Sequence, residues 1–475
     1  MISELGHLRF HKHRIGLTAT YFAVAKISPE GESARAIFNG KGYPVVAVFP
    51  LNLLGTHELF VLLRNFFPST PAIYLCDLRH FFHQIRISPT LARHFIVVCA
   101  DIAFRWDMLP MGWYLSPRVA QGIAWAIALF VPEGAPRIFE DHSHDLAPPR
   151  FVYIVDVNRR RVGLLTILYD NFAIFARDER TVQLARRRLE GNFVLFRANM
   201  KPAATTFRSR SSLLVGENDS TFRGPVHLGV EYASIANRLV WRVDSTKVKK
   251  WVLRFSTDRP LPTIWFPREL AAFIGWLLWT RTVAWMPLHC SGSLLDIASD
   301  IGAHVTTAAA NGSAKAWDSA EMVLTATNVA NLQDEWYRAA KNTWCLNITD
   351  HGVLDSAVII AADASNVGYG FVAHVVRESG GTFTILDRSA SEEAKEWHTG
   401  MSQWHIFIRE VFAAVTALRA AWSRGFRRFF LFEDNTAAKA ALERGYSVNR
   451  IARGILQRLH IDIWRATTFI GIRSE

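Results

Sequence analysis

Apolar and polar positions along the first half of the chain follow two spacings, one typical of helices and one of strands. In Leu51–Phe67 the apolar residues recur at helical spacing, which predicts a helix packed by one face. Ala72–Cys76 is a short apolar run that ends at Asp77, which predicts a buried strand. The same spacings predict strands over Arg35–Asn39, Phe95–Cys99, Val152–Val155 and Val162–Leu168, helices over Ser116–Leu129 and Thr181–Asn192, and a surface loop over Pro132–Pro149.

The pattern changes twice in the second half. Residues 245–345 are rich in tryptophan and have helical spacing. From about residue 355 strands return, and Val358–Val376 predicts a strand, a turn and a second strand. Further strands are predicted over Thr382–Leu386, Arg428–Glu433 and Thr467–Glu475, and helices over His405–Ser423 and Thr436–Arg444.

The composition is that of a globular protein with several domains. The chain has 475 residues, 50% of them hydrophobic, and a chain of this length folds as about two to four domains. The apolar stretch Leu270–Trp279 is too short to span a bilayer, so it predicts a buried helix. The N-terminus has no apolar signal core, and the four cysteines form no CxxC pair. These features favour an intracellular protein, in the cytoplasm or nucleus, without a membrane segment.

The formal net charge of +12 has two interpretations. Solvated surface charge is one of them, and binding of a polyanion is the other. Basic runs such as Asn158–Arg161, Arg186–Arg188 and Lys247–Lys250 favour the second interpretation, a nucleic-acid partner.

Two carboxylates stand beside apolar strands. Asp77 ends Ala72–Cys76, and Asp170 lies with Asn171 between two apolar runs. A strand that ends in a carboxylate can hold a metal ion on a rigid support. The alternative is that an aspartate at a strand end is only a turn or cap residue, which is the more frequent case for one aspartate alone. Between the two aspartates lies the segment Phe104–Pro117, in which a Leu-Pro-Met-Gly turn precedes an aromatic residue and a Ser-Pro pair.

Together these three segments resemble the palm of a reverse transcriptase. The matching patterns are the first metal aspartate with an aromatic residue five positions later, the Leu-Pro-Gln-Gly-aromatic-x-x-Ser-Pro turn, and the Tyr-x-Asp-Asp hairpin. The resemblance implies nucleotidyl transfer with Mg²⁺ (or Mn²⁺), in which two metal ions roughly 3.5–4 Å apart are held by carboxylates. Asp77 and Asp170 match the metal ligands, and Asn171 takes the third catalytic position.

The sequence departs from the family pattern at three positions. Leu168 replaces the usual Tyr of the hairpin, and Asn171 replaces its second Asp. Asparagine removes a negative charge near the metals but keeps an oxygen acceptor, while the main ligand of the pair, Asp170, is intact. Met111 replaces the usual Gln of the turn, which removes a polar contact to the incoming nucleotide.

The resemblance also implies residues that bind the substrate. Arg35 matches a basic residue that contacts the triphosphate, and Phe82 matches an aromatic that excludes the ribose 2′-hydroxyl. Met111 and Gly112 match the turn beside the incoming nucleotide, and Lys201 matches a lysine that neutralises the pyrophosphate. The alternatives are that Arg35 is a plain surface arginine, Phe82 a core phenylalanine and Lys201 a solvated lysine.

The pattern after residue 355, three strands followed by a helix with acids at strand ends, resembles ribonuclease H. The resemblance implies that Asp363, Glu410 and Asp434 hold metal ions for hydrolysis of the RNA strand of a hybrid. The family uses a fourth acid after a final strand. Thr467–Glu475 matches that strand, and the fourth acid is absent from this sequence. We therefore expect a truncated product or fragment, weak or inactive as a ribonuclease H.

The predicted fold class is α+β, a right-hand polymerase followed by a connection and a ribonuclease H-like α/β domain. The predicted domains are an N-terminal extension (1–30), fingers and palm (31–235), a helical thumb and connection (236–350) and a truncated ribonuclease H-like domain (351–475). Val226–Tyr232 resembles the Leu-Gly strand that closes the palm.

The sequence thus predicts an RNA-directed DNA polymerase of a retrotransposon, most similar to the DIRS order and its VIPER-like group. The implied partners are an RNA template, a DNA primer, an RNA–DNA hybrid and deoxynucleoside triphosphates; the oligomeric state is left open. The alternative is a catalytically inactive nucleic-acid-binding relic of a retroelement, which Asn171 and the missing fourth acid favour.

Overall fold

The computed structural model describes residues 8–10, 21–28, 31–38, 51, 53–99, 102–141, 148–202, 205–215, 222–313, 315–346, 356–365, 368–377, 383–389 and 403–471. The chain divides into two units. The first comprises Met1–Gly55, Ser69–Leu228 and Ala233–Asn237, and the second comprises Thr56–Pro68, Gly229–Tyr232 and Arg238–Glu475. The domain boundaries after residues 30, 235 and 350 stay predictions.

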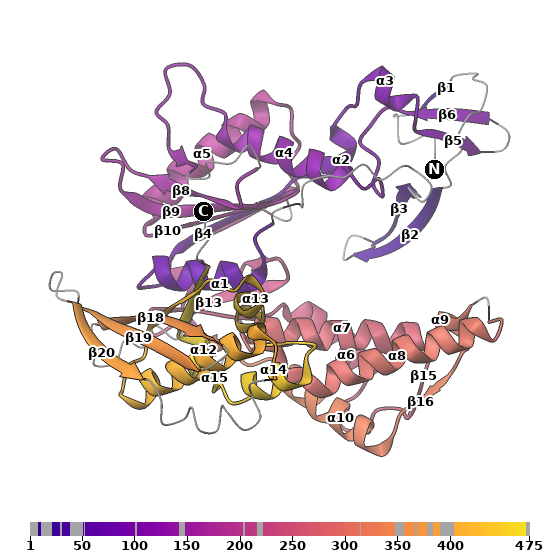
Figure 1. The fold of residues 1–475 in the computed structure, drawn as a ribbon. Coiled ribbons are helices and arrows are strands. Elements are labelled where there is room, and N and C mark those ends of the chain that lie inside the picture. Colours follow the sequence, from indigo (N-terminus) through magenta and orange to yellow (C-terminus); the bar gives the residue numbers. More distant parts are fainter. Residues whose placement is uncertain are drawn as a thin grey trace. The chain divides into compact units, whose positions relative to one another are not determined.

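The centre of the first unit is a six-stranded antiparallel sheet with strand order β11-β4-β10-β9-β8-β7. Its strands are β4 (Ala72–Asp77), β7 (Phe139–Glu140), β8 (Phe151–Val155), β9 (Arg161–Leu168), β10 (Asn171–Ala176) and β11 (Thr206–Arg208). Ala72 of β4 lies opposite Ala176 of β10, and Asp77 lies opposite Asn171. The helices α4 (Ser116–Leu129) and α5 (Glu179–Leu195) cover one face of this sheet (Figure 1).

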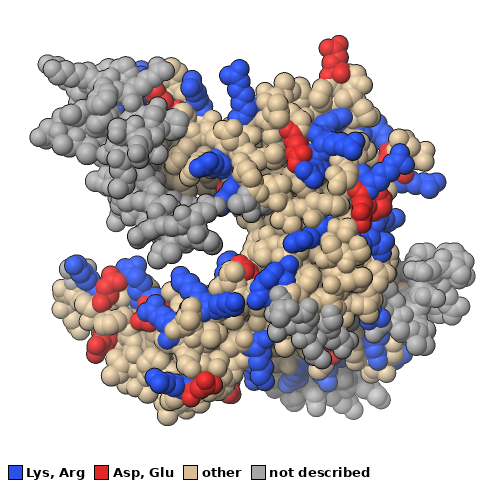
Figure 2. Space-filling model, turned by 180° about the vertical axis from the view of Figure 1, so that it is seen from behind, with Lys and Arg blue, Asp and Glu red and all other residues tan. Residues whose placement is uncertain are grey.

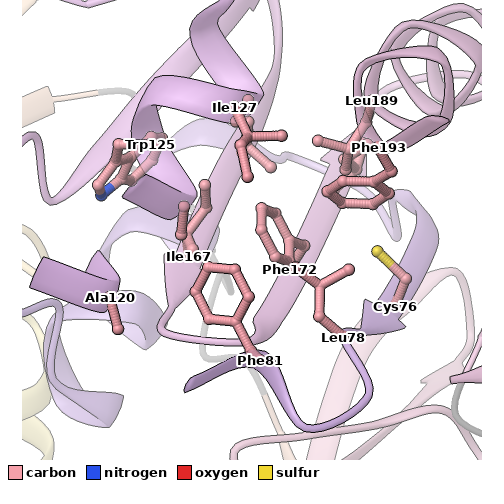
Figure 3. Packing of buried hydrophobic residues seen from close by; sticks show 14 of the residues in the cluster. Cys76, Leu78, Phe81, Ala120, Trp125, Ile127, Ile167, Phe172, Leu189 and Phe193 are labelled. Carbon is pink, nitrogen blue, oxygen red and sulfur yellow. The ribbon is translucent and has the colours of Figure 1, made fainter. Parts of the chain in front are cut away.

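An apolar core joins these two helices to the sheet. Figure 3 shows side chains of β4, β9 and β10 meeting those of α4 and α5. The rings of Phe172 and Phe193 pack edge to face with centroids 5.0 Å apart, and burial of each such side chain contributes about 1.5–3 kcal/mol. The buried amide of Asn192 donates to the carbonyls of Ile127 at 2.8 Å and Phe130 at 3.0 Å. It therefore satisfies carbonyl groups at the C-terminal end of α4 that have no partner within the helix.

Smaller elements complete the first unit. A three-stranded sheet has the order β1-β6-β5, and β2 pairs with β3. The bounds are β1 (Leu8–Phe10), β2 (Tyr21–Ser28), β3 (Gly31–Phe38), β5 (Ile96–Cys99), β6 (Ile102–Trp106), α2 (Phe81–Gln84), α3 (Pro89–Ala92) and the 3₁₀ turn η3 (Ser211–Leu213).

The helical part of the second unit matches the tryptophan-rich segment of the sequence. Its helices are α1 (Thr56–Phe66), α6 (Ser245–Arg254), α7 (Pro267–Val283), α8 (Gly292–Ala310), α9 (Ala316–Ser319) and α10 (Ala326–Lys341), with the 3₁₀ turn η4 (Leu288–Ser291). The rings of Phe273 and Trp265 stack in its core, and that of Trp336 meets Phe273 edge to face. The strands between residues 226 and 346 are β12 (Val226–His227), β13 (Val230–Ile235), β14 (Arg238–Val243), β15 (Ile264–Trp265), β16 (Met322–Val323) and β17 (Cys345–Leu346).

The last part of the second unit is a five-stranded sheet with strand order β20-β19-β18-β21-β22. Strand β19 is antiparallel to its neighbours β18 and β20, whereas β21 runs parallel to β18 and β22 runs parallel to β21. The bounds are β18 (Ser356–Ala364), β19 (Tyr369–Arg377), β20 (Phe383–Ser389), β21 (Phe429–Glu433), β22 (Thr467–Gly471), α12 (Ile406–Ser423), α13 (Thr436–Arg444), α14 (Arg450–Leu456) and α15 (Ile461–Arg465). The chain is therefore a mixed helix and sheet structure, as predicted.

Three sequence predictions differ from the structure. The first 30 residues, predicted as a weakly patterned extension, contain β1 and β2. The predicted strand Val226–Tyr232 is broken, because Leu228 and Gly229 adopt positive φ angles of 53° and 79° and turn the chain. The predicted loop Pro132–Pro149 contains β7, since Phe139 is buried and pairs with Ile154.

Among the described residues, no helix combines the length and the apolar character that crossing a membrane requires.

Candidate functional sites

The two aspartates predicted to bind metal lie at the same edge of the central sheet. Asp77 is the last residue of β4 and lies opposite Asn171, the first residue of β10. One residue later, the amide of Leu78 donates to the backbone carbonyl of Asp170 at 2.9 Å. The Asn171 side-chain amide donates to Asp170 Oδ1 at 3.1 Å. The structure therefore brings together the predicted catalytic residues Asp77, Asp170 and Asn171, all of them half-buried.

The hairpin that carries Asp170 is held from α4. Leu168 and Asn171 pair across the turn, and Tyr169 within it has a φ angle of 55°, a left-handed conformation that costs a non-glycine residue about 1–2 kcal/mol. Gln121 of α4 is 2% exposed. Its Oε1 accepts from the amide of Tyr169 at 2.8 Å, and its Nε2 donates to the carbonyl of Ile167 at 2.9 Å. Gln121 thus holds the end of β9 and the first residue of the strained turn.

The turn with Met111 and Gly112 leads directly into the same helix. The amide of Leu109 donates to the carbonyl of Ile85 at 2.8 Å, and Ser116 Oγ donates to the carbonyl of Pro110 at 2.5 Å. Gly112 is exposed with a φ angle of 105°, which favours glycine. Met111 is half-buried. The turn is therefore braced on both sides, while Gly112 faces solvent.

Two further predicted substrate residues border the aspartates. The Phe82 ring lies 6.1 Å from that of Tyr169, centroid to centroid, and packs against the core as well. The backbone amide of Lys201 donates to the carbonyl of Asp77 at 2.7 Å. The structure thus places the backbone of Lys201 directly beside the first aspartate.

Arg35 is not brought to these residues by any described contact. It lies on β3 with its Cα opposite that of Val24, and its side chain lies outside the part of the chain that the structure describes.

A cavity of about 330 Å³ lies beside the segment that directly follows β4. Its lining residues are Arg79, His80, His83, Gln84, Arg86, Met108, Arg197 and Asn199. The side chain of Gln84 closes one wall, because its Oε1 accepts from the amide of Asn199 at 2.8 Å. Three arginines make this cavity electropositive and suited to phosphate groups.

The second group of predicted acids gathers at one end of the five-stranded sheet. Strands β18 and β21 run parallel, and Ala361 pairs with Phe432. Asp363 and Asp434 come two residues after this pair on neighbouring strands. Glu410 of α12 is buried, and its ligand oxygen, that of Asp434 and that of Glu433 all lie within 4.8 Å of one another. The structure thus adds Glu433 to the three acids that the sequence predicts.

The electrostatics of this group reflect crowded, buried carboxylates. Burial raises the pKa of Glu410 to about 8, with further increases from the charges of Glu433, Asp363 and Asp434. Burial likewise raises the pKa of Glu433 to about 7; a hydrogen bond from the backbone of Asn435 lowers it, and the charges of Asp434 and Asp363 raise it. Asp363 is exposed, yet its charge acts on both glutamates.

Both groups consist of oxygen donors, the ligands that Mg²⁺ prefers. Glu410 Oε2 and Glu433 Oε2 are buried without a hydrogen-bond partner among the described residues. Buried carboxylate oxygens in this state favour either a proton or a cation. The second group therefore fits a divalent metal ion, and the first fits one by its donor set of two carboxylates and an amide oxygen.

Sequence reasoning missed Gln121 and Glu433. A glutamine among the alanines and other apolar residues of Ser116–Leu129 is the signal for the first, because a buried amide requires partners. The signal for Glu433 is an acid at a position of β21 where the alternation along the strand predicts a buried apolar residue.

No protein-family model and no curated protein matches the chain. Among solved structures it is similar to the foamy viral protease-reverse transcriptase dRH in complex with ds DNA, at 10% identity and a TM-score of 0.45, over 100% of this chain and 68% of that one. The foamy viral protease-reverse transcriptase in complex with dsDNA gives 10% identity and a TM-score of 0.45, over 100% of this chain and 81% of that one. The foamy viral protease-reverse transcriptase in complex with RNA/DNA hybrid gives 11% identity and a TM-score of 0.48, over 100% of this chain and 53% of that one.

Proposed function

We propose that this chain is an RNA-directed DNA polymerase, a reverse transcriptase, with an attached ribonuclease H-like domain. It extends a DNA primer along an RNA template with deoxynucleoside triphosphates. The observation that carries the proposal is the position of Asp77 opposite Asn171, with Asp170 tied to Leu78 one residue further on. Nucleotidyl transfer requires carboxylates that converge from separate strands, and this register supplies them.

In the transfer step the 3′-hydroxyl oxygen of the primer bonds to the α-phosphorus. The bond from that phosphorus to the bridging oxygen breaks, and pyrophosphate leaves as the hydroxyl proton is lost. Asp77 and Asp170 would hold Mg²⁺ (or Mn²⁺) ions, which when bound lower the pKa of the hydroxyl and neutralise the triphosphate. Asn171 orients Asp170 through the 3.1 Å hydrogen bond between their side chains.

The neighbouring residues take supporting roles. Lys201, fixed beside Asp77 through its backbone, offers a positive charge to the departing pyrophosphate. Phe82 forms the wall against the sugar beside Tyr169, and Met111 and Gly112 border the incoming base. Arg35 is proposed to contact the triphosphate from β3.

The nucleic acid is held mainly through its phosphates. Lys and Arg number 54 against 42 Asp and Glu, and Figure 2 shows many basic side chains at the surface. An RNA–DNA hybrid is also the substrate proposed for the second site, where Asp363, Glu410 and Asp434 would hold metal ions for hydrolysis of the RNA strand.

Asn171 favours a second candidate, a catalytically inactive relic that binds nucleic acid. A neutral residue at this position leaves two carboxylates for two metal ions, which weakens metal binding at the palm. The intact pair of Asp77 and Asp170 supports the enzyme instead.

Primer extension separates the two candidates. Purified chain is given an RNA template, a labelled DNA primer, deoxynucleotides and Mg²⁺, and extension is compared with that of Asp77→Ala and Asp170→Ala. We expect extension by the unaltered chain and a loss of about 10³-fold or more in each variant, with duplex binding nearly unchanged. Asp334→Ala, which removes an exposed acid of α10, is the control. Extension by Asp77→Ala at the unaltered rate refutes the palm assignment, and no extension by any form supports the relic.

Among retroelements we propose the DIRS order and its VIPER-like group. This placement rests only on a resemblance of two sequence segments, Ile406–Val411 at the start of α12 and Phe432–Lys439 from the end of β21 into α13. Sequencing the source DNA on both sides tests it. A tyrosine recombinase in a neighbouring reading frame is the expected result, and an integrase with a zinc motif contradicts the placement.

A further inference from the structure

Glu433 occupies a core position of its strand. In β21 the side chains of Phe429, Leu431 and Glu433 are buried on one face, while Phe430 and Phe432 are half-buried on the other. Alternation along a strand therefore places Glu433 where an apolar residue is expected. It is 1% exposed, and burying an ionised carboxylate without a charged partner costs several kcal/mol.

The hydrogen bonds of Glu433 do not account for its burial. Its Oε1 accepts a hydrogen bond of 3.2 Å from the amide of Asn435, and its Oε2 has no partner within the described ranges. Glu410, also buried at 4% exposure, accepts from the backbone of Ala364 and likewise has an Oε2 without a partner. Neither glutamate forms an ion pair with a described residue. Two buried acids thus each present an unsatisfied oxygen.

Both glutamates also lie close to the exposed Asp434. The ligand atoms of Glu410, Glu433 and Asp434 lie within 4.8 Å of one another. Two oxygens on opposite sides of a six-coordinate Mg²⁺ ion are about 4.2 Å apart, twice the metal–oxygen distance of about 2.1 Å. A small change of side-chain torsion therefore brings all three into one coordination sphere, and the exposed position of Asp434 gives the ion a path from solvent.

We propose that Glu433 is a ligand of a divalent cation that it holds together with Glu410 and Asp434. Resemblance assigns metal binding in this part of the chain to Asp363, Glu410 and Asp434, and Glu433 adds a carboxylate that the resemblance does not provide. With Asp363, the end of the sheet then carries four acids. The inference extends the second site of the proposed function, but cation binding is measurable without any polymerase or hydrolase activity.

The test is Mn²⁺ binding to the full chain, followed by electron paramagnetic resonance of free Mn²⁺. All variants carry Asp77→Asn and Asp170→Asn, so that the palm does not contribute. We expect Glu433→Gln to weaken binding by about tenfold or more, and Glu410→Gln to do the same, because each removes one carboxylate ligand. Glu443→Gln, an identical change at a 40% exposed acid of the neighbouring α13, should leave the affinity unchanged.

A purely structural role for Glu433 gives a different pattern. In that case Glu433→Gln lowers the Tm in EDTA and leaves Mn²⁺ affinity unaltered. As a metal ligand, Glu433 destabilises the metal-free chain, so Glu433→Gln keeps or raises the Tm in EDTA and loses most of the Tm increase that Mn²⁺ causes. Equal Mn²⁺ affinity in the reference chain and Glu433→Gln overturns the proposal. The Mn²⁺ measurement does not depend on primer extension. Failure of the polymerase assignment therefore leaves the cation-binding result valid, and failure of cation binding at Glu433 leaves the polymerase assignment valid.

Discussion

Gln121 and Tyr169 are joined by a hydrogen bond of 2.8 Å from the Tyr169 amide to the Gln121 side-chain carbonyl. The bond ties the first turns of α4 to the hairpin that carries Asp170. Because α4 begins at the turn with Met111 and Gly112, one buried side chain connects two parts of the proposed nucleotide site.

Gln121→Leu should therefore reduce catalysis more than it reduces binding. The change leaves the Tyr169 amide and the Ile167 carbonyl without their partner, which costs about 1–3 kcal/mol for each buried group. We expect kcat for primer extension to fall by about tenfold or more, with the Kd for duplex changed less than about twofold. Gln183→Leu on α5, at a half-buried position, serves as the control. Equal kcat values for Gln121→Leu and Gln183→Leu would show that the hairpin does not need this support.

Asn171→Asp should keep or raise the polymerase activity. The change gives up the amide that donates to Asp170 Oδ1 and places a second carboxylate beside it. In the absence of a cation, two like charges at this distance lower the stability of the fold. When Mg²⁺ is present, the two carboxylates bind it more tightly than one carboxylate and an amide do. The Mg²⁺ concentration that gives half-maximal extension should therefore decrease, and the Tm in EDTA should decrease as well. An increase in the required Mg²⁺ concentration contradicts this role.

Duplex binding should weaken steeply as salt increases. Phosphate contacts release counterions, so the logarithm of the binding constant falls linearly with that of the salt concentration. Replacing one contacting arginine reduces the slope by about one unit. We expect this for Arg79→Gln and Arg197→Gln, both exposed at the cavity beside α2, and no change for the exposed Arg458→Gln. A salt-independent Kd, or a strong dependence on base sequence, argues against binding through phosphates.

His227 should make the chain labile to acid. Burial lowers its pKa to about 4, below the ordinary value of about 6.5. His227 therefore binds a proton more readily in the unfolded chain than in the folded one. Part of the free energy of unfolding present above pH 6.5 is lost as the pH falls toward 4. At pH 5 the loss is about 2 kcal/mol. His227→Gln removes this group, so its Tm relative to that of the unaltered chain should be higher at pH 5 than at pH 7.5. A Tm difference that is the same at both pH values excludes His227 as the cause.

The sequence predicted elements best where local pattern alone determines them. The helix Ser116–Leu129 and the strand that ends at Asp77 have the bounds expected, because an apolar run and its polar ends are sufficient signals. Glu433 and Gln121 were missed because their roles come from partners distant in sequence, Glu410 in one case and Tyr169 in the other. The helix predicted from Leu51 begins at Thr56, and β7 was missed because a two-residue strand has no measurable period.

The helix α1 has its partners far along the chain. Its Phe60 ring stacks on Trp241 with centroids 4.2 Å apart. Arg64 lies over the ring of Trp285 and donates to the carbonyl of Arg465, 401 positions later. During synthesis, α1 leaves the ribosome long before these partners exist, and synthesis proceeds at about 5–20 residues per second. Its ring partners Trp241 and Trp285 follow Phe60 and Arg64 by 181 and 221 positions, so this face of the helix stays uncovered for about 9–44 seconds, time in which a chaperone or a second nascent chain has access to it.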